Sequence, residues 1–223
     1  MLDIAMMQRV LQTEEHDDLC TLRGPRAVTP CFTPGTHIAT PRGLRLAENL
    51  RIGDPVVTRD NGVQHIRWTG LRGFGADDLR YASHLQPVLV LKDSLGDGVP
   101  ERDMLVSPNH RLLVSNDKAL VHFDEPEVLV AAKHLTGVKG VDAIETTAIT
   151  YLHLMFDRHE VILADGVWTE SFQPEDDTLA GLDNARRSEI LEIFPKLRLK
   201  AGRQAYGVAR RVLSMREALK VVQ

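Results

Sequence analysis

Between residues 31 and 172, the sequence consists of short apolar runs separated by turn signals, and helical periodicity is poor. Asp60-Asn61-Gly62 is a strong hairpin signal between Pro55–Thr58 and the alternating apolar and polar residues of Val63–Trp68. Many short strands at close spacing are typical of an all-β domain. The other predicted strands are His37–Thr40, Pro87–Lys92, Met104–Val106, Arg111–Val114, Glu127–Val130, Ile149–Phe156 and Glu160–Leu163.

The segments before and after this region have residue patterns that do not predict strands. After residue 174, Asp183 is predicted to cap a helix that Pro195 stops, and residues 206–219 are predicted to form a second helix with a basic outer face. The sequence therefore predicts three parts, which are a weakly ordered leader over 1–30, an all-β domain over 31–174 and a helical tail over 175–223.

The charge of the chain is uneven. Residues 196–223 hold eight basic residues and one acid, Glu217, so this segment is near +7 and the rest of the chain near −11. A basic segment can bind nucleic acid, an anionic membrane surface or another acidic partner, and it can also dock on the acidic body of its own chain. These alternatives stay open at the level of the sequence.

Composition excludes several other classes of protein. Two cysteines, Cys20 and Cys31, can supply neither a disulfide framework nor a four-thiolate zinc site, and we expect no metal or other cofactor. No apolar run approaches the roughly 18 residues of a membrane helix, and the N-terminus does not read as a secretory signal. We therefore expect a cytoplasmic monomer without a transmembrane segment, with export by a route lacking a cleavable signal as the alternative.

Three clusters contain residues that can carry chemistry. Cys31 opens the β region, although a free cysteine is usually a small buried hydrophobe. Ser107 precedes His110 by three residues, so a hydroxyl and an imidazole can point at one peptide group from a single turn. Around Asp157 and His159, a second imidazole is flanked by carboxylates.

In their order and spacing, these clusters resemble the Hedgehog/intein (Hint) family of self-processing β domains, in particular its bacterial branch. Cys31–Ile38 resembles the first block of that family, Ser107–His110 its Thr-x-x-His block and His153–Phe172 its closing block. The resemblance extends from Cys31 to about Pro174. It implies a compact, pseudo-twofold all-β horseshoe whose two ends meet, so that residues distant in the sequence share a site.

The resemblance also implies a reaction. The Cys31 thiolate attacks the carbonyl of Pro30, the peptide rearranges to a thioester in an N-to-S acyl shift, and the chain is cleaved between these two residues. The substrate is then the chain's own N-terminal segment. The implied site consists of Cys31 as nucleophile, His110 as proton donor to the leaving nitrogen, Ser107 to polarise or orient the peptide, and Asp157 or His159 to activate the thiol.

The sequence departs from the splicing members of the family at the closing block. Splicing inteins end in His-Asn, whereas this chain has Glu170 and Ser171 at the corresponding positions, and serine has no amide nitrogen to cyclise. We therefore expect self-cleavage without splicing, and slow attack because the Pro30 ring crowds its own carbonyl. The alternative is a catalytically degenerate binding or regulatory module whose basic tail recruits an acidic partner. A third interpretation is a hydrolase acting in trans through Cys31 and His110.

Overall fold

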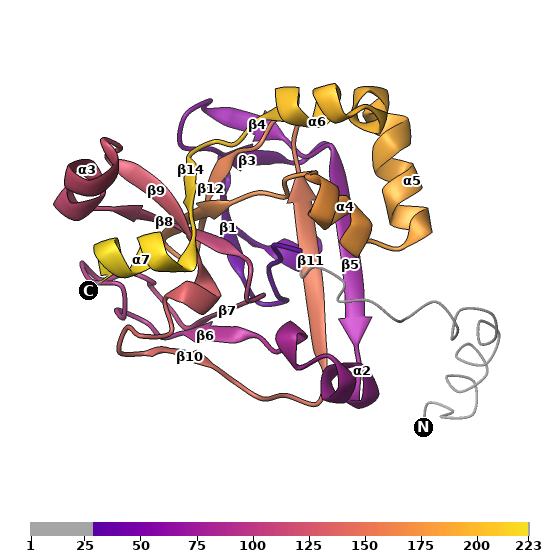
Figure 1. Cartoon of the computed structure of the whole chain (residues 1–223). Helices are drawn as coiled ribbons and strands as arrows, with labels where there is room; N and C mark the ends of the chain where they lie inside the picture. Colours follow the sequence, from indigo (N-terminus) through magenta and orange to yellow (C-terminus); the bar gives the residue numbers. More distant parts are fainter. Residues whose placement is uncertain (1–28, 223) are drawn as a thin grey trace.

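The computed structural model describes residues 29–222, and Figure 1 shows a body of β-sheets with helices at its edges. The largest sheet has seven strands. In spatial order they are β14 (Arg211–Leu213), β9 (Glu127–Ala131), β8 (Arg111–Ser115), β13 (Val167–Glu170), β12 (Val161–Ala164), β1 (His37–Thr40) and β2 (Gly43–Leu46). The predicted leader lies outside the described residues except for Thr29 and Pro30.

Three smaller sheets complete the body. They are the sheet of β10 (Val141–Ala143), β6 (Val88–Val90) and β7 (Met104–Val106), the antiparallel ribbon of β11 (Ile149–Met155) and β5 (Trp68–Phe74), and the hairpin of β3 (Pro55–Val57) and β4 (Val63–His65). Phe32 forms isolated bridges with both Val106 and Leu152. The residue after Cys31 is therefore tied to β7 and β11 at once.

The predicted strands are confirmed, with small differences at their ends. The turn between β3 and β4 contains Gly62 at a φ of +63°, a left-handed conformation that favours glycine. The strand β5 was not predicted over its full length, because Gly70 and Gly73 lower its strand propensity. Its pairing with β11 along seven residues compensates for that low propensity.

Two short helices interrupt the body where poor helical periodicity predicted none. In α3 (Asp117–Phe123), the side chain of Asn116 accepts a hydrogen bond of 2.9 Å from the Ala119 N–H. Before α2 (Ala76–Tyr81), Asp78 accepts a hydrogen bond from the Gly75 N–H. Helices of six or seven residues are too short to show a periodic pattern, and local capping stabilises them instead.

In the tail, the first predicted helix is present and the second is not. After α4 (Asp176–Gly181), helix α5 (Asn184–Ile193) begins behind Asp183, whose side chain accepts from the Arg186 N–H, and a 3₁₀ turn starts at Pro195. The predicted helix over residues 206–219 is wrong. Instead α6 (Lys200–Tyr206) ends before Gly207, which has a φ of +68°, and then β14 and α7 (Met215–Val222) follow.

The formation of β14 has a tertiary cause. Residues 211–213 pair in parallel with β9, whose outer edge would otherwise leave backbone donors and acceptors without partners. Leu213 is buried in the main core as a result. The helical pattern of the segment is therefore overridden by a partner strand about 80 residues earlier.

The tail is an integral part of the fold. A second apolar cluster joins residues of the body to residues of the tail, and Figure 1 shows α4 and α5 beside β5. Its buried members are Trp68, Met155 and Phe172 from the body and Leu179, Leu182, Ile190 and Leu197 from the tail.

Candidate active site

Cys31 is buried, with 2% of its surface exposed, and its sulfur faces polar atoms. The thiol donates to the carbonyl oxygen of Thr29 at 2.9 Å, and Sγ lies 3.3 Å from the Thr29 hydroxyl. Sγ is also 3.5 Å from Nδ1 and 3.6 Å from Nε2 of His153. The thiol is therefore placed against an imidazole and is not enclosed by aliphatic groups alone.

His153 is a site residue that the sequence reasoning did not assign. This buried side chain of β11 places Nδ1 at 3.1 Å from the carbonyl oxygen of Pro30 and Nε2 at 3.4 Å from the Thr29 hydroxyl. A neutral imidazole with its proton on Nδ1 can donate to the carbonyl and accept at Nε2. The available signal was a single histidine within the apolar residues of Tyr151–Phe156.

The ribbon of β5 and β11 holds the His153 ring in place. His153 lies opposite Gly70, where a Cβ would be 2.4 Å from the Trp68 ring and 3.1 Å from the imidazole, so this close approach requires glycine. Trp68 stacks on His153 at 5.9 Å between ring centroids, and Phe172 meets the imidazole edge-on at 5.1 Å. The indole N–H of Trp68 donates to Glu189 of α5 at 3.0 Å, which connects the tail to this arrangement.

Ser107 fixes the peptide between Pro30 and Cys31 from the other side. Its hydroxyl accepts from the Cys31 N–H at 2.9 Å and donates to the Thr29 carbonyl at 2.9 Å. The Ser107 N–H donates to the Cys31 carbonyl at 3.1 Å. These bonds hold the peptide in a defined orientation, and a catalytic part for Ser107 stays a prediction.

His110 lies beside the next residue along the chain. Its ring packs edge-on against Phe32 at 4.5 Å, and Nε2 is hydrogen-bonded to the Thr169 hydroxyl. Because that hydroxyl donates to the Arg111 carbonyl at 2.9 Å, it accepts from His110, and the proton is on Nε2. Nδ1 is buried and has no hydrogen-bond partner among residues 29–222. Its predicted part as proton donor stays a prediction.

Asp157 and His159 have partners other than Cys31. Asp157 is 59% exposed and forms an ion pair with Arg67 at 3.2 Å. His159 accepts from the Ala209 N–H at Nδ1, at 3.0 Å, and its Nε2 lies 3.2 Å from a carboxylate oxygen of Glu170. The structure does not bring these two residues to the thiol, and their part in its activation stays a prediction.

Glu170 and Ser171, which occupy the positions of the splicing His-Asn pair, form hydrogen bonds to neighbouring strands and loops. The buried Glu170 carboxylate accepts from the Arg111 N–H at 2.8 Å and from its guanidinium at 3.1 Å. The Ser171 hydroxyl accepts from the Glu160 N–H at 2.9 Å. Both side chains are thus committed to contacts that keep β13 against its neighbours.

Burial sets the charge state of the site. Desolvation raises the pKa of the Cys31 thiol to about 12 and lowers the pKa of both His153 and His110 to about 4. At pH 7 the thiol and both imidazoles are therefore neutral. Because the thiol is protonated at pH 7, any attack by Cys31 would require a base that removes this proton.

These depressed histidine pKa values predict a loss of stability in acid. Between pH 6.5 and about 4 the unfolded chain binds protons at His110 and His153 that the folded chain excludes, so stability falls as the pH falls through this window. The expected loss is about 3 kcal/mol for each histidine. Chemical denaturation of the Cys31→Ala variant across this pH range measures it.

The matched controls for this prediction are two histidine variants. His153→Gln is expected to reduce the pH dependence, whereas His122→Gln, at an exposed position on α3, is expected to leave it unchanged. Burial raises the pKa of Glu160 and of Asp165, so these carboxyl groups increase stability as the pH falls. Their contribution is the same in both variants and does not affect the comparison. An identical pH dependence in the parent and in His153→Gln would contradict the prediction.

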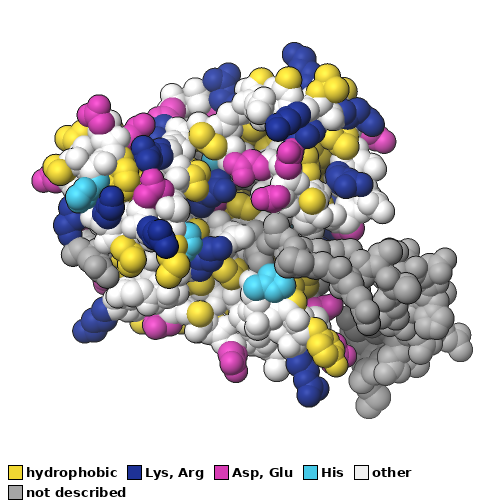
Figure 2. All heavy atoms as spheres, viewed as in Figure 1, with side chains coloured by type: hydrophobic (Ala, Val, Ile, Leu, Met, Phe, Trp, Pro, Cys, Tyr) yellow, Lys and Arg dark blue, Asp and Glu magenta, His cyan; other side chains and the backbone are white. Residues whose placement is uncertain are grey.

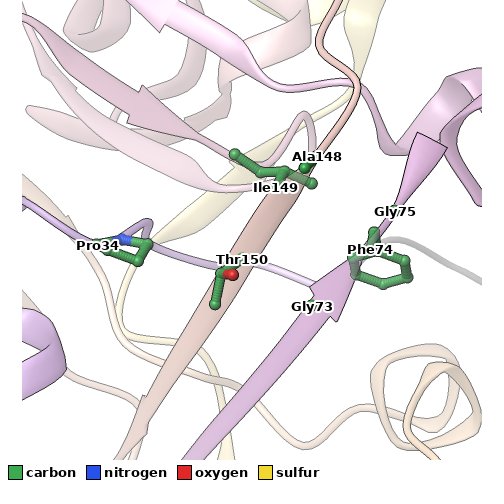
Figure 3. Close-up of a pocket in the computed structure, with 7 residues that line it drawn as sticks. All are labelled: Pro34, Gly73, Phe74, Gly75, Ala148, Ile149 and Thr150. Carbon is green, nitrogen blue, oxygen red and sulfur yellow. The ribbon is translucent and has the colours of Figure 1, made fainter. Parts of the chain in front are cut away.

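The site around Cys31 does not coincide with an open pocket on the body. Figure 3 shows that this pocket is lined by Pro34, by residues 73–75 at the end of β5 and by residues 148–150 at the start of β11. Cys31 is not among its lining residues.

Within residues 29–222, no group of three His, Cys, Asp or Glu side chains is placed to hold a metal ion. None of the helices described there is both long and apolar enough to span a membrane.

Solved structures that resemble this chain include three intein-related domains. A crystal structure of the gp41-1 intein is 11% identical, with 64% of this chain and 98% of that chain covered and a TM-score of 0.38. The solution structure of a bacterial intein-like domain from Clostridium thermocellum is 14% identical, with 65% and 99% covered and a TM-score of 0.39. A splice-inactive variant of the AceL NrdHF class 3 split intein is 15% identical, with 64% and 97% covered and a TM-score of 0.41.

Family membership rests on the match to a family model. No curated protein matches the chain. The model of the Hint domain, in contrast, matches residues 30–176, which begin one residue before Cys31 and end at the start of α4. This match confirms the predicted fold class, a Hint domain built mainly of β-sheets. Because it extends over more than half of the sequence, the chain belongs to the Hint domain family.

Proposed function

We propose that this Hint domain acts on its own backbone and cleaves between Pro30 and Cys31 through a thioester. The observation that supports this proposal is that one imidazole contacts both reacting groups. Nδ1 of His153 lies 3.1 Å from the Pro30 carbonyl oxygen, and its two ring nitrogens lie 3.5 and 3.6 Å from the Cys31 sulfur. A group in this place can polarise the carbonyl and accept the thiol proton.

In the first step, Sγ of Cys31 forms a bond to the carbonyl carbon of Pro30. The thiol proton passes toward Nε2 of His153, and the Nδ1–H of the same ring stabilises the negative charge that develops on the carbonyl oxygen. In this proposal His153 takes the part that the family resemblance implied for Asp157 or His159, because it is the imidazole in contact with the sulfur.

In the second step, the bond between the Pro30 carbonyl carbon and the Cys31 nitrogen breaks. The nitrogen gains a proton and becomes an amine, and the His153 imidazolium releases to solvent the proton that it took from the thiol, so no proton is gained or lost overall. We assign delivery of the proton on the amine to His110, which first has to take up a proton from solvent at Nδ1; that atom is buried beside Phe32 and has no hydrogen-bond partner within residues 29–222. Its low pKa makes protonation of Nδ1 unfavourable at pH 7, and slow processing is expected.

The thioester is then open to water or to an added thiol, and the products are residues 1–30 and 31–223. The closing block supports cleavage without splicing. Ser171 lacks an amide nitrogen, and its hydroxyl is hydrogen-bonded to the Glu160 N–H. The following residue, Phe172, is buried against Trp68 and His153, so the chain continues directly into the packed tail. The tail therefore stays with the C-terminal product.

Intact-mass measurement of the full chain tests the proposal. Wild type incubated with hydroxylamine or dithiothreitol is expected to yield fragments 1–30 and 31–223, because both reagents cleave thioesters. Cys31→Ala is expected to stay intact, and Cys20→Ala, which changes the other cysteine, is expected to cleave like wild type. A wild-type chain that remains intact under these conditions would overturn the proposed function.

The two alternative functions have less support. Arg210 of the tail pairs with Asp60 at 2.6 Å and with Glu127 at 2.8 Å, which favours self-docking of the tail over recruitment of an acidic partner. On the face shown in Figure 2, basic and acidic side chains are interspersed. A hydrolase acting in trans needs an accessible nucleophile, whereas Cys31 is buried.

A further inference from the structure

We propose that Thr29, two residues before the nucleophile and within the segment to be released, is a catalytic residue of this cleavage. The inference rests on the proposed function and adds a group that the released segment itself supplies. The Thr29 hydroxyl lies 3.3 Å from the Cys31 sulfur and 3.4 Å from Nε2 of His153. It therefore contacts the atom that loses a proton and the atom that receives it.

The geometry favours a route through this hydroxyl. The direct separation between Sγ and Nε2 is 3.6 Å, which is longer than either contact of the hydroxyl. A threonine hydroxyl can donate and accept hydrogen bonds at the same time. It can therefore take the thiol proton while it passes its own proton to Nε2, and the lone pair there is available because Nδ1–H is directed at the Pro30 carbonyl.

The backbone of Thr29 organises the same centre. Its carbonyl oxygen accepts from the Cys31 thiol at 2.9 Å and from the Ser107 hydroxyl at 2.9 Å. The side chain and the carbonyl of Thr29 thus contact Cys31, Ser107 and His153 together. Thr29 is itself 9% exposed, so bulk water is largely excluded from the place that its hydroxyl occupies.

The step balances without any added reactant. The bond from Sγ to the Pro30 carbonyl carbon forms as the S–H bond breaks, and the carbonyl π electrons move to the oxygen. The S–H bond turns from the Thr29 carbonyl toward the Thr29 hydroxyl, whose oxygen takes the thiol proton, and the proton previously on that hydroxyl goes to Nε2 of His153. Thr29 is unchanged at the end of the step, and the proton then resides on the His153 imidazolium.

A consequence follows for the substrate. If the released segment contributes a hydroxyl, the domain selects junctions by the residue at position 29. Segments with threonine or serine there are substrates, and segments with an aliphatic residue of the same shape are poor ones. This selectivity resides in the part of the chain that is removed.

The test compares Thr29→Val with Thr29→Ser in the full chain. Valine keeps the shape and removes the hydroxyl, whereas serine keeps the hydroxyl. Cleavage rates at pH 7 are measured by intact mass after trapping with hydroxylamine. Thr29→Val is expected to be slower than wild type by at least about tenfold, and Thr29→Ser is expected to stay within about threefold. Thr29→Ala is expected to behave like the valine variant.

A pH profile separates the proton relay from a structural role. Hydroxide can replace the missing relay, so the rate of Thr29→Val is expected to rise more steeply than that of wild type between pH 7 and 10. Loss of packing alone would slow the reaction by the same factor at every pH, and that result would overturn the inference. Thermal midpoints on the Cys31→Ala background show that the variants fold alike.

Two further outcomes distinguish a failure of the Thr29 inference from a failure of the proposed function. If wild type cleaves and Thr29→Val cleaves as fast as Thr29→Ser, the role of Thr29 is overturned and the proposed function stands. If wild type does not cleave at all, the proposed function fails and the role of Thr29 fails with it.

Discussion

Replacing His153 with glutamine is expected to slow thioester formation at Pro30–Cys31 by at least about a hundredfold. Glutamine retains a hydrogen-bond donor for the Pro30 carbonyl, which His153 Nδ1 contacts at 3.1 Å, but it cannot accept the thiol proton. The effect is expected to be large because burial raises the pKa of the Cys31 thiol to about 12, so that attack at pH 7 depends on a base in contact with the sulfur.

The measurement is the rate of fragment formation by intact mass in the presence of hydroxylamine. His122→Gln, the same substitution at an exposed position on α3, serves as the control and is expected to keep the wild-type rate. His110→Gln allows the two buried imidazoles to be compared. If His153→Gln cleaved normally while His110→Gln was inactive, the assignment of the proton acceptor would be reversed.

Trp68→Ala is expected to lower the free energy of unfolding by about 3–5 kcal/mol, the usual cost of truncating a large buried aromatic residue. Trp68 is 1% exposed and lies in the cluster that joins the body to the tail. Its removal would leave a cavity between Phe172, His153 and α5, and it would leave the Glu189 carboxylate without its indole donor. Denaturant titration on the Cys31→Ala background measures the change.

The second tryptophan of the chain provides the matched control. Trp168 is only partly buried and lies against the Arg59 guanidinium, 5.1 Å from its ring centroid. Trp168→Ala is therefore expected to cost less than half as much stability as Trp68→Ala. Because Trp68 stacks on His153, only its substitution is expected to slow cleavage in the folded protein. Equal losses of stability in the two variants would show that the second cluster does not carry the expected burial energy.

Much of the fold was predictable because most strands are short apolar runs with turn signals at their ends. The hairpin at Asp60-Asn61-Gly62 and the helix behind Asp183 depend on local chemistry, and both are present where they were predicted. The strand β14 was not predictable in this way, because residues 211–213 carry a helical pattern and become a strand only through pairing with β9. The glycines of β5 concealed a strand for a related reason, since Gly70 provides space for rings from other parts of the chain.

The candidate site shows the same division. Cys31, Ser107 and His110 can be recognised in the sequence by residue type and spacing. In the structure, the Ser107 hydroxyl accepts a hydrogen bond from the Cys31 backbone N–H. His153 did not stand out, because a single histidine in an apolar strand looks like a core residue. Its contact with the sulfur depends on the bridge between Phe32 and Leu152, which sets β11 beside the segment that contains Cys31.

The sequence alone determined the all-β body, the family resemblance and the candidate nucleophile, because these depend on local residue patterns and on their order along the chain. The tertiary structure alone decided which imidazole meets the thiol, how the tail packs behind it and that Thr29 touches both. The physical reason is that proton transfer requires the two groups to come within hydrogen-bonding reach of each other. Such contacts arise from strand pairing between segments more than a hundred residues apart, and local patterns contain no information about that pairing.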